Sequence, residues 1–176
     1  MIIIEIQGKS GNFFLGGGRR ILFERRIRFL LYLRMLQLGK YKLLYPLAYI
    51  GRYMISHRCG LEILPQTDIG AGFRLVHPYN ITINPEAKLG RNINIYKGAT
   101  IGYARGEKAG VPTVGDNVQI GINATIVGGI EIGDDVLIAP NTFINENVPS
   151  HSIVIGNPAI ILPRDNATKD YIEFQV

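Results

Sequence analysis

Residues 114–144 read VGDNVQ IGINAT IVGGIE IGDDVL IAPNTF I, and every sixth residue of this stretch is a branched aliphatic. The positions are Val114, Ile120, Ile126, Ile132, Ile138 and Ile144. Neither a helix nor an ordinary hairpin protein produces a period of six, because their side chains repeat every 3.6 and every two residues. A short strand with one inward aliphatic, followed by a turn and another short strand, does produce it. The stretch therefore predicts a parallel β-helix whose stacked coils bury columns of aliphatic residues.

The same period continues toward the N-terminus, with one slip and one excursion. The earlier aliphatic positions are Ile63, Ile69, Leu75 and Ile81 and then, two residues later, Ile83, Leu89, Ile95 and Ile101. Residues 103–110, YARGEKAG, form the excursion before the period resumes. We therefore expect a mainly β protein with its β-helix at 61–162. An N-terminal strand and helical region at 1–60 would precede it, and a C-terminal tail at 163–176 would follow.

The composition bounds the kind of protein and its environment. A chain of 176 residues can form one compact domain with a modest extension, and 21 glycines and nine prolines are typical of many turns between short strands. The single cysteine, Cys59, excludes an internal disulfide and favours a reducing compartment. No signal peptide and no apolar run of membrane-spanning length is visible. We therefore expect a cytoplasmic protein.

The net charge of +5 is unevenly distributed. Residues 19–58 carry ten Lys and Arg against one Glu, which makes this segment +9 and the remainder −4. Aliphatic residues recur there at three- and four-residue spacings, which indicates helices, with Gly39 as a stop. Two interpretations are open: the helices pack on the β-helix or on neighbouring subunits, or they lie on the anionic inner face of a membrane. Nucleic-acid binding is disfavoured, because the segment is too apolar and carries no binding motif.

The repeats are followed by Gly156-Asn157-Pro158-Ala159, and together they resemble the hexapeptide-repeat acyltransferase superfamily. The resemblance covers residues 61–162 and implies a left-handed β-helix that works as a homotrimer. Within the superfamily the chain is similar to the serine acetyltransferase-like branch, and there to the O-acetyltransferases of colanic acid and capsular polysaccharide synthesis. The stretches that carry this similarity are Glu62-Ile63 through Ile69-Gly70 to Val76-His77, Gly98-Ala99-Thr100-Ile101-Gly102, and Thr113-Val114-Gly115.

His77 aligns with the general base of this branch. A hydroxyl is a poor nucleophile until its proton is removed, and an imidazole can accept a proton near neutral pH. Glu62 lies fifteen residues earlier, where the family carries an acidic partner, usually Asp. The resemblance implies that Glu62 orients the imidazole and stabilises its charged form. His151 fits the family's closing loop, and we expect it to be structural.

The resemblance also implies acetyl-CoA as the co-substrate, bound largely by backbone groups of successive coils. By position, Gly102, Ile122 and Pro140 would line the groove for its pantetheine arm, where backbone N–H groups could stabilise the tetrahedral oxyanion. A covalent acyl-enzyme is not expected, because Cys59 lies outside the repeats. No metal is expected either, since a centre of the carbonic anhydrase type needs three histidines and the central repeats hold only His77.

Two departures from serine acetyltransferases bear on the acceptor. Those enzymes carry Asp directly before the catalytic His, and an Arg-His pair before a Pro in the loop between repeat blocks. This chain has Val76 and Ala109-Gly110-Val111-Pro112 instead. A site without these ionic contacts would bind a zwitterionic amino acid poorly.

The sequence therefore predicts acetylation of a sugar hydroxyl, on a free or lipid-linked glycan precursor of a capsule or exopolysaccharide. A lipid-linked acceptor would agree with peripheral contact of residues 19–58 with the inner membrane face. Serine O-acetylation in cysteine biosynthesis is the enzymatic alternative, and a β-helix scaffold is the non-enzymatic one. The glycines of the 103–110 excursion favour a mobile loop over the acyl donor or acceptor, with a tolerated surface insertion as the other interpretation.

Overall fold

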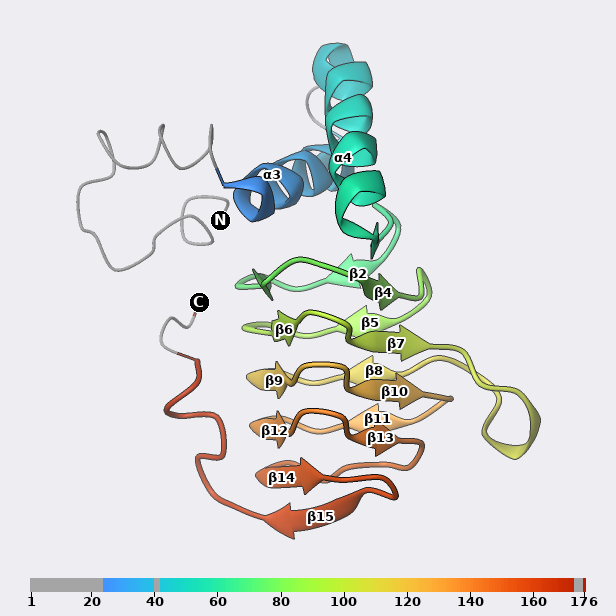
Figure 1. The fold of residues 1–176 in the computed structure, drawn as a ribbon, viewed down its shortest axis with the longest axis vertical. Coiled ribbons are helices and arrows are strands. Elements are labelled where there is room, and N and C mark those ends of the chain that lie inside the picture. The colour runs from blue at the N-terminus through green and yellow to red at the C-terminus, as the bar shows by residue number, and fades with distance from the viewer. Residues whose placement is uncertain (1–23, 40–41, 173–175) are drawn as a thin grey trace.

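The computed structural model describes residues 24–39, 42–172 and 176, which form a parallel β-solenoid capped by two helices (Figure 1). Short strands stack into three sheets, and the sheets are parallel except for the last strand of the third. This arrangement confirms the predicted mainly β fold. The strand expected near the start of the chain, at residues 2–6, lies outside the described residues.

Each face of the solenoid is one sheet. Sheet A contains β1 (Leu61–Glu62), β4 (Ile81–Ile83), β7 (Thr100–Gly102), β10 (Thr125–Val127) and β13 (Phe143–Ile144). Sheet B contains β2 (Asp68–Ile69), β5 (Lys88–Leu89), β8 (Thr113–Val114) and β11 (Glu131–Ile132). Sheet C contains β3 (Arg74–Val76), β6 (Asn94–Tyr96), β9 (Val118–Ile120), β12 (Val136–Ile138), β14 (Ser152–Ile155) and the antiparallel β15 (Ile160–Pro163).

The period of six corresponds to one inward side chain on each strand, and the strand register aligns these side chains in columns. In sheet A the column is Ile83, Ile101, Ile126 and Ile144. In sheet B it is Ile69, Leu89, Val114 and Ile132, and in sheet C it is Leu75, Ile95, Ile120 and Ile138. All of these residues are at most 6% exposed. Three aliphatic columns therefore form the core of the solenoid, as the sequence predicts.

The two-residue slip in the period has a structural cause at the first corner between sheets C and A. Eight residues separate the inward Leu75 of β3 from the inward Ile83 of β4, whereas six separate Ile95 from Ile101 one coil later. The columns stay aligned, so the two additional residues enlarge the corner itself. His77 lies on this enlarged corner.

Two helices cover the N-terminal end of the stack (Figure 1). Helix α3 (Arg25–Leu38) ends at Gly39, which has the left-handed conformation of a helix C-cap and is the predicted stop. The turn η1 (Lys42–Leu44) then leads into α4 (Tyr45–Cys59). Within the described residues, no helix has the length and apolar character needed to cross a bilayer.

Two buried arginines attach this helical cap to the first coil. Arg34 of α3 donates to the carbonyl oxygens of Ile69, at 2.7 Å, and of Gly70, at 2.5 Å. Arg52 of α4 donates to the carbonyl oxygen of Ile63 at 3.1 Å. These carbonyls lie at the end of the stack, where no preceding coil supplies N–H donors, and the guanidinium groups take that place. Of the two interpretations of the basic segment, this arrangement favours packing on the β-helix.

Two further segments depart from the regular coils. Residues 103–112 leave β7 and return to β8 as a protruding loop, which contains η2 (Gly106–Lys108) and a backbone bridge between Ala104 and Gly110 (Figure 1). After β15 the chain continues as an irregular tail that runs back along the side of the stack toward the first coils (Figure 1).

Candidate active site

The predicted base, His77, lies directly after β3 on the enlarged corner. Both His77 and Asn80 have left-handed φ angles, 54° and 53°, whereas the equivalent corners below contain one such residue each, at Gly98, Asn123 and Asn141. This conformation costs a non-glycine residue about 1 kcal/mol, so the enlarged corner holds His77 against its local preference. The imidazole is exposed and, within the described part of the chain, makes no hydrogen bond.

The predicted acidic partner, Glu62, projects outward from β1 in the same coil. Its carboxylate accepts a hydrogen bond from the hydroxyl of Thr82 at 3.1 Å. Thr82 is its register partner on β4, the strand that follows the His77 corner. His77 thus precedes β4 along the chain, and Glu62 pairs with β4 at Thr82. Among the described residues, the side chains of His77 and Glu62 are not hydrogen-bonded to each other.

The three positions predicted to line the acyl-CoA groove fall on two edges of sheet A. Ile122 and Pro140 lie on the corner between sheets C and A, in the third and fourth coils, below the corner of His77. Gly102 is the last residue of β7, at the opposite edge, where the loop 103–112 begins. A single chain therefore brings Ile122 and Pro140 to the His77 corner but not Gly102.

A cation from the helical cap also reaches this corner. Arg25, the first residue of α3, donates from Nη1 to the hydroxyl of Tyr79 at 3.3 Å. The N–H of Tyr79 donates to the carbonyl oxygen of His77 at 2.8 Å, so Tyr79 and His77 share one tight turn. The sequence alone does not indicate the contact between Arg25 and Tyr79, because no motif links positions 54 residues apart.

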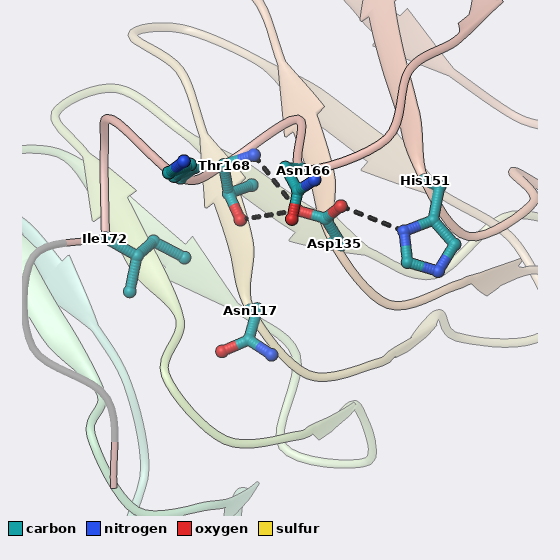
Figure 2. A pocket seen from close by; sticks show the side chains of 7 residues that line it. Asn117, Asp135, His151, Asn166, Thr168 and Ile172 are labelled. Atoms are coloured by element: carbon teal, nitrogen blue, oxygen red, sulfur yellow. Dashed lines mark hydrogen bonds and ion pairs between the residues drawn. The ribbon is translucent and has the colours of Figure 1, made fainter.

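A pocket of about 500 Å³ lies on a different corner, between sheets B and C, where the tail crosses the coils (Figure 2). Its lining residues are Asn117, Asp135, His151, Asn166, Thr168, Lys169 and Ile172. Neither the predicted catalytic residues nor the groove positions are among them. This pocket is therefore not the predicted active site.

Asp135 anchors the tail beside this pocket (Figure 2). Its carboxylate accepts hydrogen bonds from the N–H groups of Ala167, at 3.1 Å, and Thr168, at 3.0 Å, and from the Thr168 hydroxyl at 2.8 Å. His151 Nδ1 lies 2.9 Å from the same carboxylate. Burial acts to raise the pKa of Asp135, but the hydrogen bonds from Thr168, His151 and Ala167 outweigh it and hold the pKa below its ordinary value. This contact agrees with the structural role expected for His151.

The excursion at 103–112, on the edge of sheet A opposite the His77 corner, is attached to the coils below it. The Lys108 side chain donates to the carbonyl oxygen of Asn145 at 2.7 Å, and the Lys108 carbonyl accepts from the N–H of Gly129 at 3.0 Å. These contacts hold the loop along the edge of sheet A that carries Gly102. Within the described residues, no group of three or more His, Cys, Asp and Glu side chains could hold a metal ion.

Comparison with known proteins supports the transferase character of the repeats. Residues 112–146 match the family model described as bacterial transferase hexapeptide (six repeats). Serine acetyltransferase 4 of Arabidopsis thaliana is 36% identical over 110 residues, which are 61% of this chain and 31% of that protein. The serine acetyltransferase of Staphylococcus aureus (strain N315) is 36% identical over 108 residues, 60% of this chain and 50% of the relative. The chain thus matches at most half the length of these two relatives.

The solved structures agree with the sequence relatives. The serine acetyltransferase of Neisseria gonorrhoeae, solved in complex with serine, has a TM-score of 0.69 and 28% sequence identity to this chain. The match covers 90% of this chain and 64% of that one. It extends beyond the repeats, since the β-helix predicted at 61–162 is a smaller part of the chain.

These findings correct the predicted acceptor. The prediction of a sugar O-acetyltransferase for capsule or exopolysaccharide synthesis is wrong, because the relatives and structural neighbours are serine acetyltransferases. Val76 and Gly110-Val111, on which the sugar prediction depended, are all close to the motif in sequence. Side chains from distant segments also reach the His77 corner, as the hydrogen bond from Arg25 to Tyr79 shows. The associated expectations of a glycan acceptor and of membrane contact gain no support from any of these findings.

Proposed function

We propose that this chain transfers an acetyl group from acetyl-CoA to the hydroxyl of L-serine. The observation that carries the proposal is the likeness of 90% of this chain to a serine acetyltransferase solved in complex with serine. The exposed imidazole of His77 on its enlarged corner supports it, because the reaction needs a base that is open to the acceptor.

In this proposal His77 acts as the general base. Its imidazole takes the proton of the serine hydroxyl while the oxygen attacks the thioester carbonyl of acetyl-CoA. The tetrahedral intermediate then collapses with cleavage of the carbon–sulfur bond, and the imidazolium returns the proton to the departing thiolate. The products are O-acetylserine and the free thiol of CoA, and no acyl-enzyme forms.

We assign Glu62 the stabilisation of the imidazolium. Its carboxylate is exposed on β1 and already accepts from Thr82, beside the strand that His77 leads into. A negative charge in this position favours the protonated ring during proton transfer. Glu62→Gln preserves the size and the hydrogen bond from Thr82 and removes only the charge. We expect kcat to fall about 10-fold in this variant, which is less than the about 10²- to 10⁴-fold contribution of the base itself.

We propose that acetyl-CoA binds between two chains of a homotrimer. Ile122 and Pro140 lie on the His77 corner, whereas Gly102 lies on the opposite edge of sheet A with the loop that follows it. A neighbouring chain that presents its Gly102 edge to this corner would complete one groove from all three positions. Light scattering of the purified protein tests this assembly, and an active monomer would overturn it.

The first test is thiol release from acetyl-CoA with L-serine as acceptor, for the wild type and for His77→Ala. Positioned general bases contribute about 10²- to 10⁴-fold, so we expect a loss of that size in kcat. His57→Ala is the matched control, because His57 lies on α4 stacked against Tyr53 and should leave turnover unchanged. A wild type that does not acetylate L-serine, or a His77→Ala variant as active as the wild type, would overturn the proposal.

A further inference from the structure

The proposed acceptor raises a problem of charge. L-serine carries a carboxylate, and a site that recognises it needs a cation or several N–H donors within hydrogen-bond distance. The loop between the repeat blocks contains Gly110 and Val111 where serine acetyltransferases carry an Arg-His pair, so this loop supplies no cation at those positions. A cation from another part of the fold can supply this contact.

The helical cap supplies one at the His77 corner. Arg25 donates to the hydroxyl of Tyr79, and Tyr79 is bonded through its backbone to His77. The position of Arg25 is set by α3, because Phe29 and Leu33 of this helix are fully buried in the core. The guanidinium is therefore carried by a packed helix and not by a loop.

The charge of Arg25 is not neutralised within the described part of the chain. Its neighbour Arg26 donates to the carboxylate of Glu24 at 2.7 Å, whereas the hydrogen bond of Arg25 goes to the neutral hydroxyl of Tyr79. That bond uses one of the five N–H donors of a guanidinium, and Arg25 is exposed. The remaining donors have the planar arrangement that binds a carboxylate through two parallel hydrogen bonds.

We propose that Arg25, oriented by the Tyr79 hydroxyl, binds the carboxylate of the acceptor amino acid while the acceptor hydroxyl lies at His77. The inference rests on the proposed function. Arg25 is then a specificity-determining residue, and Tyr79 is a positioning residue that acts through it. The charge contact missing from the loop is supplied by the first turn of α3.

Lys97 is the competing cation. It lies on the same corner one coil below, where the N–H of Gly98 donates to the carbonyl oxygen of Tyr79 at 3.0 Å, and its side chain is exposed. An ammonium is a point charge on a flexible stem, whereas Arg25 is fixed by a hydrogen bond at its head group. Arg25 is therefore the favoured partner, and Lys97→Ala belongs in the test.

The test compares steady-state kinetics of wild type, Arg25→Ala, Arg25→Lys, Tyr79→Phe and Lys97→Ala, with L-serine and with L-serinamide as acceptors. Serinamide keeps the hydroxyl and replaces the carboxylate with a neutral amide. For Arg25→Ala we expect the KM for L-serine to rise roughly 10- to 100-fold, the effect of one lost charge-assisted contact. The kcat of Arg25→Ala and its KM for acetyl-CoA should stay within about twofold of wild type. Arg25→Lys should recover part of the loss in serine binding. Tyr79→Phe should raise the KM for L-serine by a few fold.

The control variant is Arg26→Ala, which removes an adjacent charge that Glu24 already binds. It should behave as wild type, and all variants should use serinamide equally. The assignment would be overturned if Arg25→Ala raised the KM for L-serine no more than Arg26→Ala does. It would also be overturned if Arg25→Ala impaired the use of serinamide equally, or if only Lys97→Ala raised the KM for L-serine. Each of these outcomes leaves wild-type serine acetylation intact, whereas a wild type inactive toward L-serine would overturn the proposed function itself.

Discussion

The β-solenoid and the segments attached to it are held together by different interactions. The solenoid is filled by three columns of aliphatic side chains that repeat every six residues. The cap, the loop and the tail are held in addition by polar contacts to backbone groups, among them Arg34 to the carbonyl of Ile69, Lys108 to that of Asn145, and Asp135 to the N–H of Thr168. The partners in these pairs are 35, 37 and 33 residues apart. Repetition thus determines the core, and long-range pairs determine what is attached to it.

The largest loss of stability should come from the columns. Ile120 is fully buried in sheet C between Ile95 and Ile138, and Ile120→Ala leaves a cavity that rigid coils cannot close. We expect the free energy of unfolding to fall by about 3–4 kcal/mol, measured by urea denaturation at fixed protein concentration. Thr113→Ala, on the exposed face of sheet B, is the control and should change it by less than about 0.5 kcal/mol. Similar losses in the two variants would contradict the column model of the core.

The next largest loss should come from the contact between the cap and the first coil. Arg34→Met keeps most of the apolar stem but removes the donors to the carbonyl oxygens of Ile69 and Gly70. Leaving buried acceptors unpaired should lower the free energy of unfolding by about 2–3 kcal/mol. The control is Arg58→Met, at an exposed position near the end of α4. If Arg34→Met is as mild as this control, the Arg52 bond to the Ile63 carbonyl and the apolar contacts of α3 hold the cap without Arg34.

The repeats made most of the fold predictable from the sequence. Once an aliphatic recurs every six residues, the strands, their faces and their register follow, and Ile83, Ile101, Ile126 and Ile144 align as expected. The two-residue slip in the period before Ile83 was also informative about the structure, because it corresponds to the enlarged corner on which His77 lies. The attachment of the cap was not predictable, since nothing in the local sequence of Arg34 distinguishes it from the other arginines of the basic segment.

The residues of the candidate site likewise include some that the sequence could predict and some that it could not. His77 and Glu62 were predicted because a family motif links them, and the structure places both in the first coil. Gly102 was grouped with Ile122 and Pro140 by position in the repeat, yet it lies on the other edge of sheet A. The acceptor was mispredicted from charges missing near the motif, whereas the serine acetyltransferases that the chain resembles point to serine.

The anchor of the tail should show a smaller, pH-dependent effect. Hydrogen bonds to the Asp135 carboxylate outweigh its burial and hold its pKa below that of an aspartate in the unfolded chain. The unfolded state therefore takes up the proton first as the pH falls. The stabilisation is complete above about pH 5 and is lost as the pH falls through the lower pKa of the folded state.

Asp135→Asn tests this anchor. We expect it to cost about 1–2 kcal/mol at pH 7 and to flatten the loss of stability between about pH 5 and pH 3. Trypsin should also cleave more readily after Lys169 in the loosened tail. Asp170→Asn, at an exposed position of the same tail, is the control. An unchanged acid profile in Asp135→Asn would mean that Ala167 and Thr168 are held by packing and not by the carboxylate.

The smallest effect on stability is expected at the loop. Lys108→Ala removes one exposed hydrogen bond to Asn145, while the bridge between Ala104 and Gly110 still closes the loop. The free energy of unfolding should change by less than about 0.5 kcal/mol. Turnover of Lys108→Ala is more informative than its stability, because the loop lies on the Gly102 edge, which belongs to the proposed groove between chains. If the loop covers the acyl donor, Lys108→Ala should lower kcat several-fold without loss of stability. Equal turnover in Lys108→Ala and wild type would instead support the interpretation of residues 103–110 as a tolerated insertion.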